Sequence, residues 1–244
     1  MTLPVFLVAA LPTGSSFVLD GPEGRHAATV RRLRAGEELV LSDGSGDQVR
    51  CVVAEARKDS LLLDVVERRT VPEPAVRVVL AQALVKGDRG ELAVELATEA
   101  GVDEVVPWRA SRCVTRWEDG PRGAKALERW RGTAREAAKQ ARRARVPVVG
   151  QPVGTPALAR LAAAASVTLV LHETASAGIA SVPLPAEGDV LLVVGPEGGI
   201  TSEELAALVD AGAHAVRLGP TVLRASTAGV VALGALGVLT DRWA

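Results

Sequence analysis

The sequence predicts two domains of different class: a small β-barrel over residues 1–71 and an α/β domain with a parallel sheet over residues 72–244. Three observations support this prediction. Short apolar runs separated by turn signals fill the first part of the chain. Two prolines within three residues then mark a linker over 68–74, because proline resists both helix and inner strand. Beyond the linker, apolar strands alternate with helical patterns, as in βαβ units.

Short apolar runs predict the strands of the barrel, and a glycine-rich turn over 42–46 separates two of them. These runs span residues 5–9, 16–19, 38–41, 49–54 and 60–66. A helical stretch over 26–33 interrupts the strands and is strongly basic. The arginines in and beside it are Arg25, Arg31, Arg32 and Arg34.

The second domain is predicted as a βαβ series, in which the strands run parallel and helices cover the sheet. It begins with a strand over 76–83, a helix over 88–100, a strand over 102–107 and a long helix over 123–143. In the first of these helices, Leu92, Leu96 and Ala100 share one face, and Gly101 is the expected C-terminal cap. The alternation continues through residues 158–165, 167–172, 190–194, 202–211, 215–218 and 226–240.

Composition narrows the class of protein. The chain of 244 residues has four Trp, two Phe and no Tyr, so its core must consist of Ala, Val and Leu. Cys51 and Cys113 are far apart and have no CxxC partner, and no metal-ligand spacing links the histidines. We therefore expect neither a disulfide framework nor a metal site. No signal-peptide pattern opens the chain, and the apolar run 228–239 is too short for a bilayer, so we expect a cytoplasmic protein.

Positive charge is concentrated in one segment, although the formal net charge of the chain is only −1. Within residues 122–145 only Glu128 and Glu136 oppose a run of basic side chains. Such a stripe is either a footprint for nucleic-acid phosphates or an ordinary solvated helix face. The basic residues are Arg122, Lys125, Arg129, Arg131, Arg135, Lys139, Arg142, Arg143 and Arg145.

Two glycine-proline turns form the strongest functional signal. The apolar strand 190–194 runs into Gly195-Pro-Glu-Gly-Gly199, and the strand 215–218 runs into Gly219-Pro220. A helix follows each turn. We expect the two turns to lie at the carboxyl ends of neighbouring strands, where ligands bind in an open α/β sheet.

The turns differ from known phosphate-binding loops. Neither has the Lys-Ser/Thr pair of a phosphate cradle, and the GxGxxG pattern is absent. Acidic side chains at 197, 203 and 204 would repel phosphate, so a neutral or cationic ligand fits better. Thr201 or Ser202 can cap the following helix. The tetrapeptide Gly-Pro-Glu-Gly also occurs at 21–24, so it is not diagnostic alone.

Several polar residues stand beside these turns. Arg224 lies between the second turn and the last predicted helix, where it could hold anionic charge, and Ser226 and Thr227 could cap that helix. His172 ends the strand 167–172 and is a third candidate, although a strand-end histidine often has only a structural hydrogen bond.

These segments together resemble the small-subunit ribosomal RNA uracil-N3 methyltransferases of the SPOUT superfamily. The resemblance rests on 191–204 with 218–228, and on 26–36, 41–44, 86–89, 97–102, 111–113 and 140–147. The chain departs from the family pattern at Glu95-Leu96, Thr221 and Ala225-Ser226. The resemblance implies a PUA-like RNA-binding barrel, a trefoil knot over about 167–235, a homodimer, and 16S rRNA in the small ribosomal subunit as substrate.

The resemblance also implies S-adenosylmethionine as the methyl donor and assigns residues to its site. The expected cofactor-binding residues are Leu171, His172, Val194, Gly195, Pro196, Glu197, Gly198, Gly199, Leu218, Gly219, Val222, Leu223, Ser226 and Thr227. The expected RNA-binding residues are Arg25, His26, Arg31, Arg32, Arg34, Lys86, Arg89, Arg112, Gln140, Arg142, Arg143 and Arg145.

Methyl transfer from a sulfonium is an in-line displacement that needs alignment and no metal. Uracil N3 becomes a nucleophile only after losing its proton, so the site must stabilise an anion. Arg224 is the candidate for that role, and no general base is evident. Two other functions remain open: a non-catalytic RNA-binding or ribosome-assembly protein, and a methyltransferase of the same fold that acts on tRNA or another base.

Overall fold

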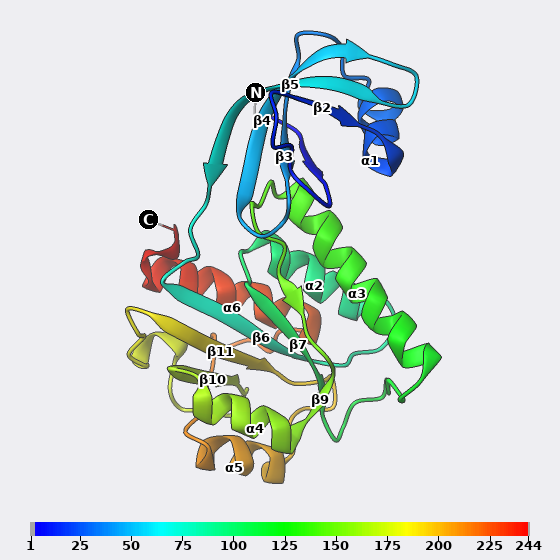
Figure 1. Cartoon of the computed structure of the whole chain (residues 1–244). Coiled ribbons are helices and arrows are strands. Elements are labelled where there is room, and N and C mark those ends of the chain that lie inside the picture. Colours follow the sequence, from blue (N-terminus) through cyan, green and yellow to red (C-terminus); the bar gives the residue numbers. More distant parts are fainter. Residues whose placement is uncertain (1–2, 244) are drawn as a thin grey trace. The chain divides into compact units, whose positions relative to one another are not determined.

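The computed structural model describes residues 3–243 and divides the chain into two compact units (Figure 1). The first comprises Met1–Glu73 together with Ala138–Val146, and the second comprises Pro74–Ala137 with Pro147–Ala244. The segment 138–146, which begins in the last turn of the long helix over 121–140, thus belongs to the N-terminal unit. No helix among the described residues is long and apolar enough to cross a membrane.

The first unit is a curled five-stranded sheet. Its strands are β1 (Val5–Leu7), β2 (Ser16–Leu19), β3 (Glu38–Ser42), β4 (Asp47–Ala56) and β5 (Leu61–Thr70), in the order β1-β3-β4-β5-β2. Only β1 and β3 pair in parallel. Two register shifts in the β4–β5 hairpin bend it, as bulges do, so that one face closes over Phe6, Leu39 and Leu63. The strand β5 continues to Thr70, so the expected linker over 68–74 begins later than predicted.

The helical stretch of the first unit also begins earlier than predicted. Helix α1 (Gly21–Arg25) leads directly into a π-helical turn, η1 (His26–Val30). Pro22 occupies the first turn of α1, where its missing amide costs nothing. The first copy of Gly-Pro-Glu-Gly is therefore a helix start.

The second unit contains a parallel sheet. Its strands are β6 (Val76–Ala83), β7 (Glu104–Arg109), β8 (Val148–Val149), β9 (Val153–Gly154), β10 (Val167–Leu171), β11 (Gly188–Val194) and β12 (His214–Val216). The order is β12-β10-β11-β6-β7-β8, with β9 also paired to β7, and every pairing is parallel. The predicted α/β class is confirmed. The central strands are buried on both faces, which explains their continuous apolar sequences.

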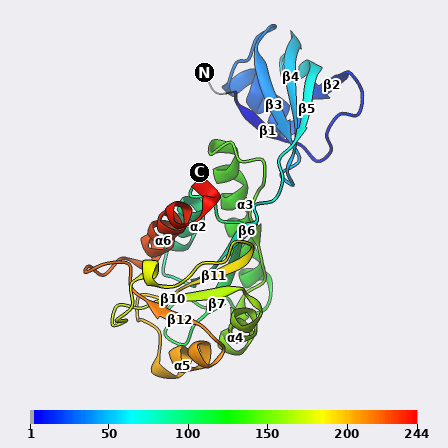
Figure 2. The same cartoon turned by 90° about the vertical axis from the view of Figure 1, so that its left-hand side faces the viewer.

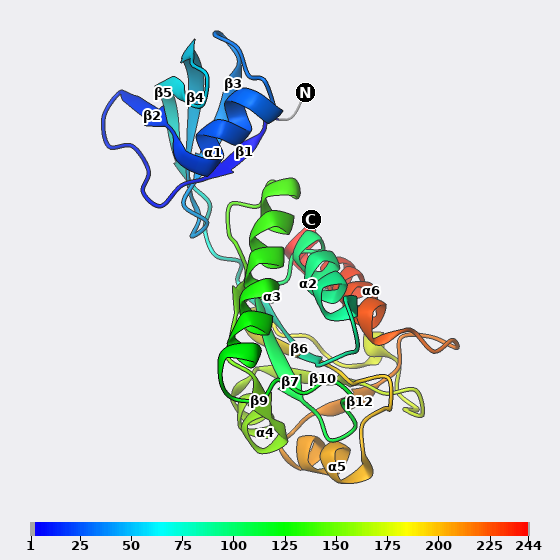
Figure 3. The same ribbon diagram turned by 90° about the vertical axis from the view of Figure 1, so that its right-hand side faces the viewer.

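Helices cover both faces of this sheet (Figures 2 and 3). They are α2 (Arg89–Glu99), α3 (Pro121–Gln140), α4 (Thr155–Ala164), α5 (Ser202–Asp210) and α6 (Ala225–Leu239), with short 3-10 turns at Ile179–Ser181 and Asp241–Trp243. Helices α2 and α6 pack together over β6 and β11, whereas α4 and α5 pack together over the opposite face. Three layers thus enclose the larger of the two cores.

The buried face of α2 differs from the predicted one. Its buried residues are small, among them Gly90, Ala93 and Ala97, whereas Leu92 is exposed. A Cβ on Gly90 would lie 2.7 Å from the ring of Trp130 in α3. Close approach of a neighbouring helix therefore selects small residues here, and the leucine spacing misidentified the face. Gly101, with φ +96°, ends the helix as predicted.

Candidate functional site

Three strand ends meet at one edge of the parallel sheet and form the candidate site. The prediction that the strands before the two glycine-proline turns are neighbours is wrong, because β10 lies between β11 and β12. The central strand brings its own carboxyl end, Leu171-His172, between the two turns. The sheet order thus adds a third segment to the site, consistent with the rule that ligands bind at this edge.

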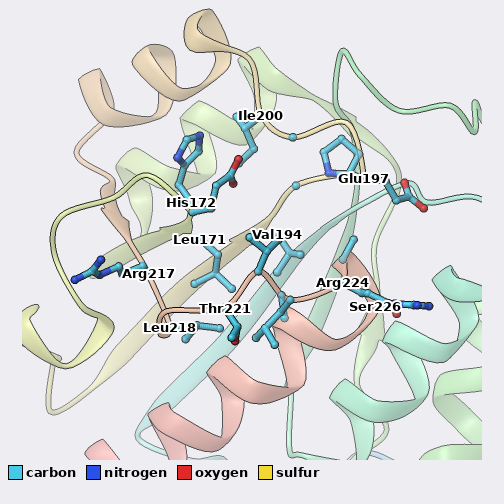
Figure 4. Close-up of a pocket in the computed structure, with 18 of the residues that line it drawn as sticks. Leu171, His172, Val194, Glu197, Ile200, Arg217, Leu218, Thr221, Arg224 and Ser226 are labelled. Carbon is cyan, nitrogen blue, oxygen red and sulfur yellow. The ribbon is translucent and has the colours of Figure 1, made fainter.

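A pocket of about 500 Å³ lies at these strand ends (Figure 4). That volume is typical of small-molecule and cofactor sites. Every predicted cofactor-binding residue except Thr227 lines it. The hydroxyl of Thr227 instead donates a hydrogen bond to the carbonyl of Arg224 at 3.2 Å, one turn back along the chain. Residues that line the pocket without having been predicted are Glu173, Ile200, Val216, Arg217, Pro220, Thr221, Ala225 and Ala228.

The first glycine turn needs glycine because other atoms approach its backbone. A Cβ on Gly195 would lie 2.6 Å from the side chain of Ile200, and one on Gly198 would lie 3.0 Å from Cβ of Arg112. Gly199 has φ +75° and donates its amide to the carbonyl of Pro196 at 2.9 Å. The turn is therefore closely packed against the segment that carries Arg112.

Glu204 joins three segments of the second unit behind this turn. Its Oε1 accepts hydrogen bonds from the amide and hydroxyl of Ser111 at 2.8 and 3.0 Å and from the hydroxyl of Thr155 at 2.9 Å. Its Oε2 accepts from the amide of Thr201, whose own hydroxyl accepts from the amide of Glu204. This capping box confirms Thr201 as the cap of α5.

The same contacts keep Glu204 ionised although it is buried. Burial raises the pKa of its carboxyl, but the hydrogen bonds from Ser111, Thr201 and Thr155 outweigh burial and leave the pKa below the ordinary glutamate value. The carboxylate thereby fixes Ser111, and the next residue, Arg112, donates its guanidinium to the carbonyl of Gly198 at 3.1 Å.

Glu197 holds the turn from its other side. Its Oε1 accepts the backbone amide of Lys86 at 3.2 Å, which links the turn to the segment after β6. Lys86 itself is exposed and contributes its backbone rather than its charge to the site.

The second turn carries the predicted arginine. Arg224 is exposed, lines the pocket and occupies the N-cap position of α6, where its carbonyl accepts the amides of Thr227 and Ala228 at 2.9 Å. Neither Ser226 nor Thr227 caps this helix with its side chain, contrary to prediction. Figure 4 shows Arg217 and Arg224 on opposite sides of the pocket.

The third segment contributes His172. Its backbone amide donates to the carbonyl of Val216 at 2.9 Å, and its Nδ1 lies 3.0 Å from the hydroxyl of Thr174. The ring lines the pocket and also has a local partner. The sequence left open whether His172 belongs to the site or only makes a structural hydrogen bond. In the structure it does both: it lines the pocket and contacts Thr174.

Comparison with known proteins agrees with this geometry. A family model described as an RNA methyltransferase domain matches residues 72–237, and one described as an RNA methyltransferase PUA domain matches residues 19–66. The chain is 54% identical to the ribosomal RNA small subunit methyltransferase E of Mycobacterium tuberculosis, over 100% of this chain and 94% of the relative. It belongs to the ribosomal RNA small subunit methyltransferase E family.

Other members of the methyltransferase E family are more distant but still match more than nine-tenths of the chain. The Bacillus subtilis protein is 30% identical over 93% of this chain and 91% of its own length. The crystal structure of the Neisseria gonorrhoeae protein, bound to S-adenosyl methionine, superposes with a TM-score of 0.85 at 26% identity and 98% coverage of both chains. The two fold classes predicted from the sequence thus correspond to the PUA and methyltransferase modules of this enzyme family.

The basic residues of this methyltransferase are more dispersed than the sequence indicates. Arg129 pairs with Glu91, Arg131 with Glu128, and Lys139 with Glu23. Arg145, predicted to bind RNA, pairs with Glu73 and donates to the carbonyls of Ser45 and Val71. It stabilises the β3–β4 turn with these contacts, and its RNA-binding role stays a prediction. Glu91, Glu23 and Glu73, which are distant in sequence, thus neutralise part of the predicted stripe.

The remaining predicted RNA-binding residues fall into two groups. Arg89 and Arg112 line the pocket at the strand ends of the second unit. Lys86 also belongs to the second unit, where it follows β6. All the others lie in the first unit. The first-unit group comprises Arg25, His26, Arg31, Arg32, Arg34, Gln140, Arg142 and Arg143.

Proposed function

We propose that the protein transfers a methyl group from S-adenosylmethionine to N3 of a specific uridine in 16S rRNA. The observation that carries this proposal is the pocket at the carboxyl ends of β10, β11 and β12, which is lined by both glycine turns together with apolar and charged side chains. The names of the family relatives and the cofactor in the Neisseria gonorrhoeae structure support the same reaction.

The residues of the pocket fit S-adenosylmethionine. Leu171, Val194, Leu218 and Leu223 give apolar walls suited to an adenine ring, and the glycine turns offer amides and carbonyls close to a ligand. Glu173 and Glu197 supply negative charge that favours a sulfonium. When bound, this cofactor supplies an electrophilic methyl group.

Arg224 is the residue that we assign to the chemistry of the acceptor base. Uracil N3 must lose its proton before it can attack, and the negative charge that develops on the base needs a fixed cation. Arg224 lines the pocket, and no side-chain ion pair of Arg224 occurs among residues 3–243. Its guanidinium is therefore available to the acceptor. Glu197, already bonded to the Lys86 amide, holds the turn rather than the substrate proton.

A second copy of the chain is proposed as a partner, docked on α6. This helix has no charged residue between 225 and 240, and helices that are apolar all round are normally buried. Val231, Val238 and Leu239 are nevertheless 46%, 76% and 44% exposed. A homodimer interface would cover them beside the pocket, because α6 begins directly after Arg224.

The C-terminal segment is further proposed to form a trefoil knot. Arg217, just beyond β12, donates its amide to the carbonyl of Ala177 at 2.9 Å and accepts the amide of Ile179 at 3.1 Å. Its neighbours in space thus belong to the connection between β10 and β11. Passage of the chain through this connection would bring α6 back over the sheet. The expected site of action is the cytoplasm, where ribosomal subunits are assembled.

Calorimetry with S-adenosylmethionine and transfer of tritiated methyl groups test the proposal. We expect binding of the cofactor and transfer to small ribosomal subunits, but not to tRNA. Failure to bind the cofactor would favour a non-catalytic RNA-binding or ribosome-assembly protein. Transfer to tRNA in place of small subunits would favour a methyltransferase with another substrate.

A further inference from the structure

Two arginines in the first unit hold a backbone conformation that normally belongs to glycine. Arg32 has φ +57° and Arg142 has φ +55°, and no other non-glycine residue among 3–243 has a positive φ. Each stands just beyond a helix, Arg32 after η1 and Arg142 after α3. Glycine is favoured at such positions because a Cβ there costs about 1 kcal/mol or more. Retention of arginine therefore points to a use for its side chain.

Both positions adjoin one small pocket of the first unit, about 80 Å³ in volume. Arg142 lines the pocket, and Arg32 directly follows Arg31, which also lines it. Segments more than a hundred positions apart in sequence thus converge there. The lining residues are Pro4, Val5, Phe6, His26, Arg31, Lys139, Gln140 and Arg142.

The chemistry of the lining favours an anion. Lys139 is already matched, because its ammonium lies 2.7 Å from Glu23 in a pair that is almost fully buried on the lysine side. The guanidinium groups of Arg31 and Arg142 are exposed, and within the described chain neither forms an ion pair or hydrogen bond. Gln140 adds a side-chain amide. The guanidinium groups of Arg31 and Arg142 are therefore free to donate hydrogen bonds to a bound anion.

Size and shape restrict the anion further. His26 packs edge to face against Phe6 with ring centroids 5.8 Å apart, which gives the imidazole a fixed apolar support. The volume suits one phosphate group and is too small for a nucleoside. Two guanidinium groups from segments distant in sequence can both donate to the oxygens of one phosphodiester, and the left-handed backbone of Arg142 sets the direction in which its side chain leaves the chain.

We propose that His26, Arg31, Gln140 and Arg142 form a phosphate pocket that binds one phosphodiester of the RNA. This inference rests on the proposed function, since it assumes an RNA substrate, and it adds a defined contact remote in sequence from the methyl-transfer site. One backbone phosphate held there would fix the register of the RNA without reading its sequence.

The test uses the full-length variant Arg142→Gly. Glycine removes the guanidinium and relieves the left-handed strain, so the melting temperature is expected to stay level or rise. In filter binding to 16S rRNA we expect the affinity to fall about tenfold. The slope of log affinity against log salt concentration should become less steep by about one, the value for loss of one phosphate contact. Arg160→Ala, which removes an exposed charge on α4, is the control and is expected to change neither.

The outcomes separate the two proposals. If the wild-type protein binds RNA and Arg142→Gly binds it with unchanged affinity and salt slope, the phosphate pocket is overturned while the proposed function stands. If the wild-type protein binds no RNA, both fall. Inorganic phosphate forms a second arm, monitored through the His26 ring by NMR. A phosphate response that Arg142→Gly abolishes, without any loss of RNA affinity, would assign the pocket to small anions and overturn the RNA contact.

Discussion

The carboxylate of Glu204 accepts both the backbone amide and the hydroxyl of Ser111, at 2.8 and 3.0 Å, across 93 positions of sequence. Through this relationship one buried charge ties the start of α5 to the segment that carries Arg112. Arg112 in turn donates to the carbonyl of Gly198 in the first glycine turn, which lines the pocket. The geometry of the turn therefore depends on a residue that does not line the pocket.

Substitution Glu204→Gln tests this dependence. Both carboxylate oxygens of Glu204 accept hydrogen bonds, and glutamine replaces one of them with an NH₂ group that can only donate. At least one hydrogen bond is therefore lost, at a cost of about 1–3 kcal/mol in the free energy of unfolding. Urea denaturation measures this cost, and calorimetry should show weaker S-adenosylmethionine binding. Glu203→Gln is the matched control, since that neighbour is exposed. Equal behaviour of the two variants would contradict the role of Glu204.

The contribution of Glu204 should also depend on pH. Its pKa in the folded protein is lowered from 4.5, so the stability it confers is fully present above that value and is lost as the pH falls through the folded pKa. The difference in unfolding free energy between wild type and Glu204→Gln should therefore be largest near neutral pH and shrink below pH 4.5. A difference that grows on acidification would have the wrong sign.

Gly198→Ala tests the close approach of Arg112. The added Cβ would lie 3.0 Å from Cβ of Arg112 and 3.2 Å from its carbonyl oxygen, so one backbone must move. If overpacking of about 1–3 kcal/mol falls on the bound state, cofactor affinity drops by roughly 5- to 150-fold, measured by calorimetry. Gly132→Ala, in an open part of α3, should bind normally and gain about 0.5–1 kcal/mol in stability.

Arg224→Ala should separate binding from chemistry. We expect the affinity for S-adenosylmethionine to remain near that of the wild type while methyl transfer falls by a factor of about 100 to 1000, as for loss of an oxyanion-stabilising group. Calorimetry and tritium transfer provide the two readouts. Arg224→Lys keeps the charge and should recover part of the rate. Turnover near normal in the alanine variant would remove Arg224 from the mechanism.

Val238→Glu addresses the proposed dimer. This valine is 76% exposed on the apolar helix α6, and a carboxylate in a dimer interface would be desolvated without a partner. Light scattering after gel filtration should report a dimer for the wild type and a monomer for the variant. Val209→Glu, an exposed valine on α5, should leave the dimer intact. A wild-type protein that is monomeric at every concentration would exclude the proposed interface.

Local sequence signals predicted the elements and much of the pocket. Strands and glycine turns depend on neighbours in sequence, so their patterns located the two turns, and Thr201 was one of the two expected caps of α5. The family resemblance supplied the list of cofactor-binding residues, all but one of which line the pocket. Long-range contacts were not predictable. The interposition of β10, the pairing of Lys139 with Glu23 and the internal role of Arg145 depend on folding, which brings distant charges and strands together.

The most direct test of the proposed reaction is nucleoside mass mapping of 16S rRNA. Small ribosomal subunits from a strain that lacks this protein would be incubated with the purified enzyme and S-adenosylmethionine, then digested and analysed by mass spectrometry. We expect one uridine to gain a methyl group at N3, and only when both enzyme and cofactor are present. Absence of N3-methyluridine, or a methyl group on another base or on tRNA alone, would contradict the proposal.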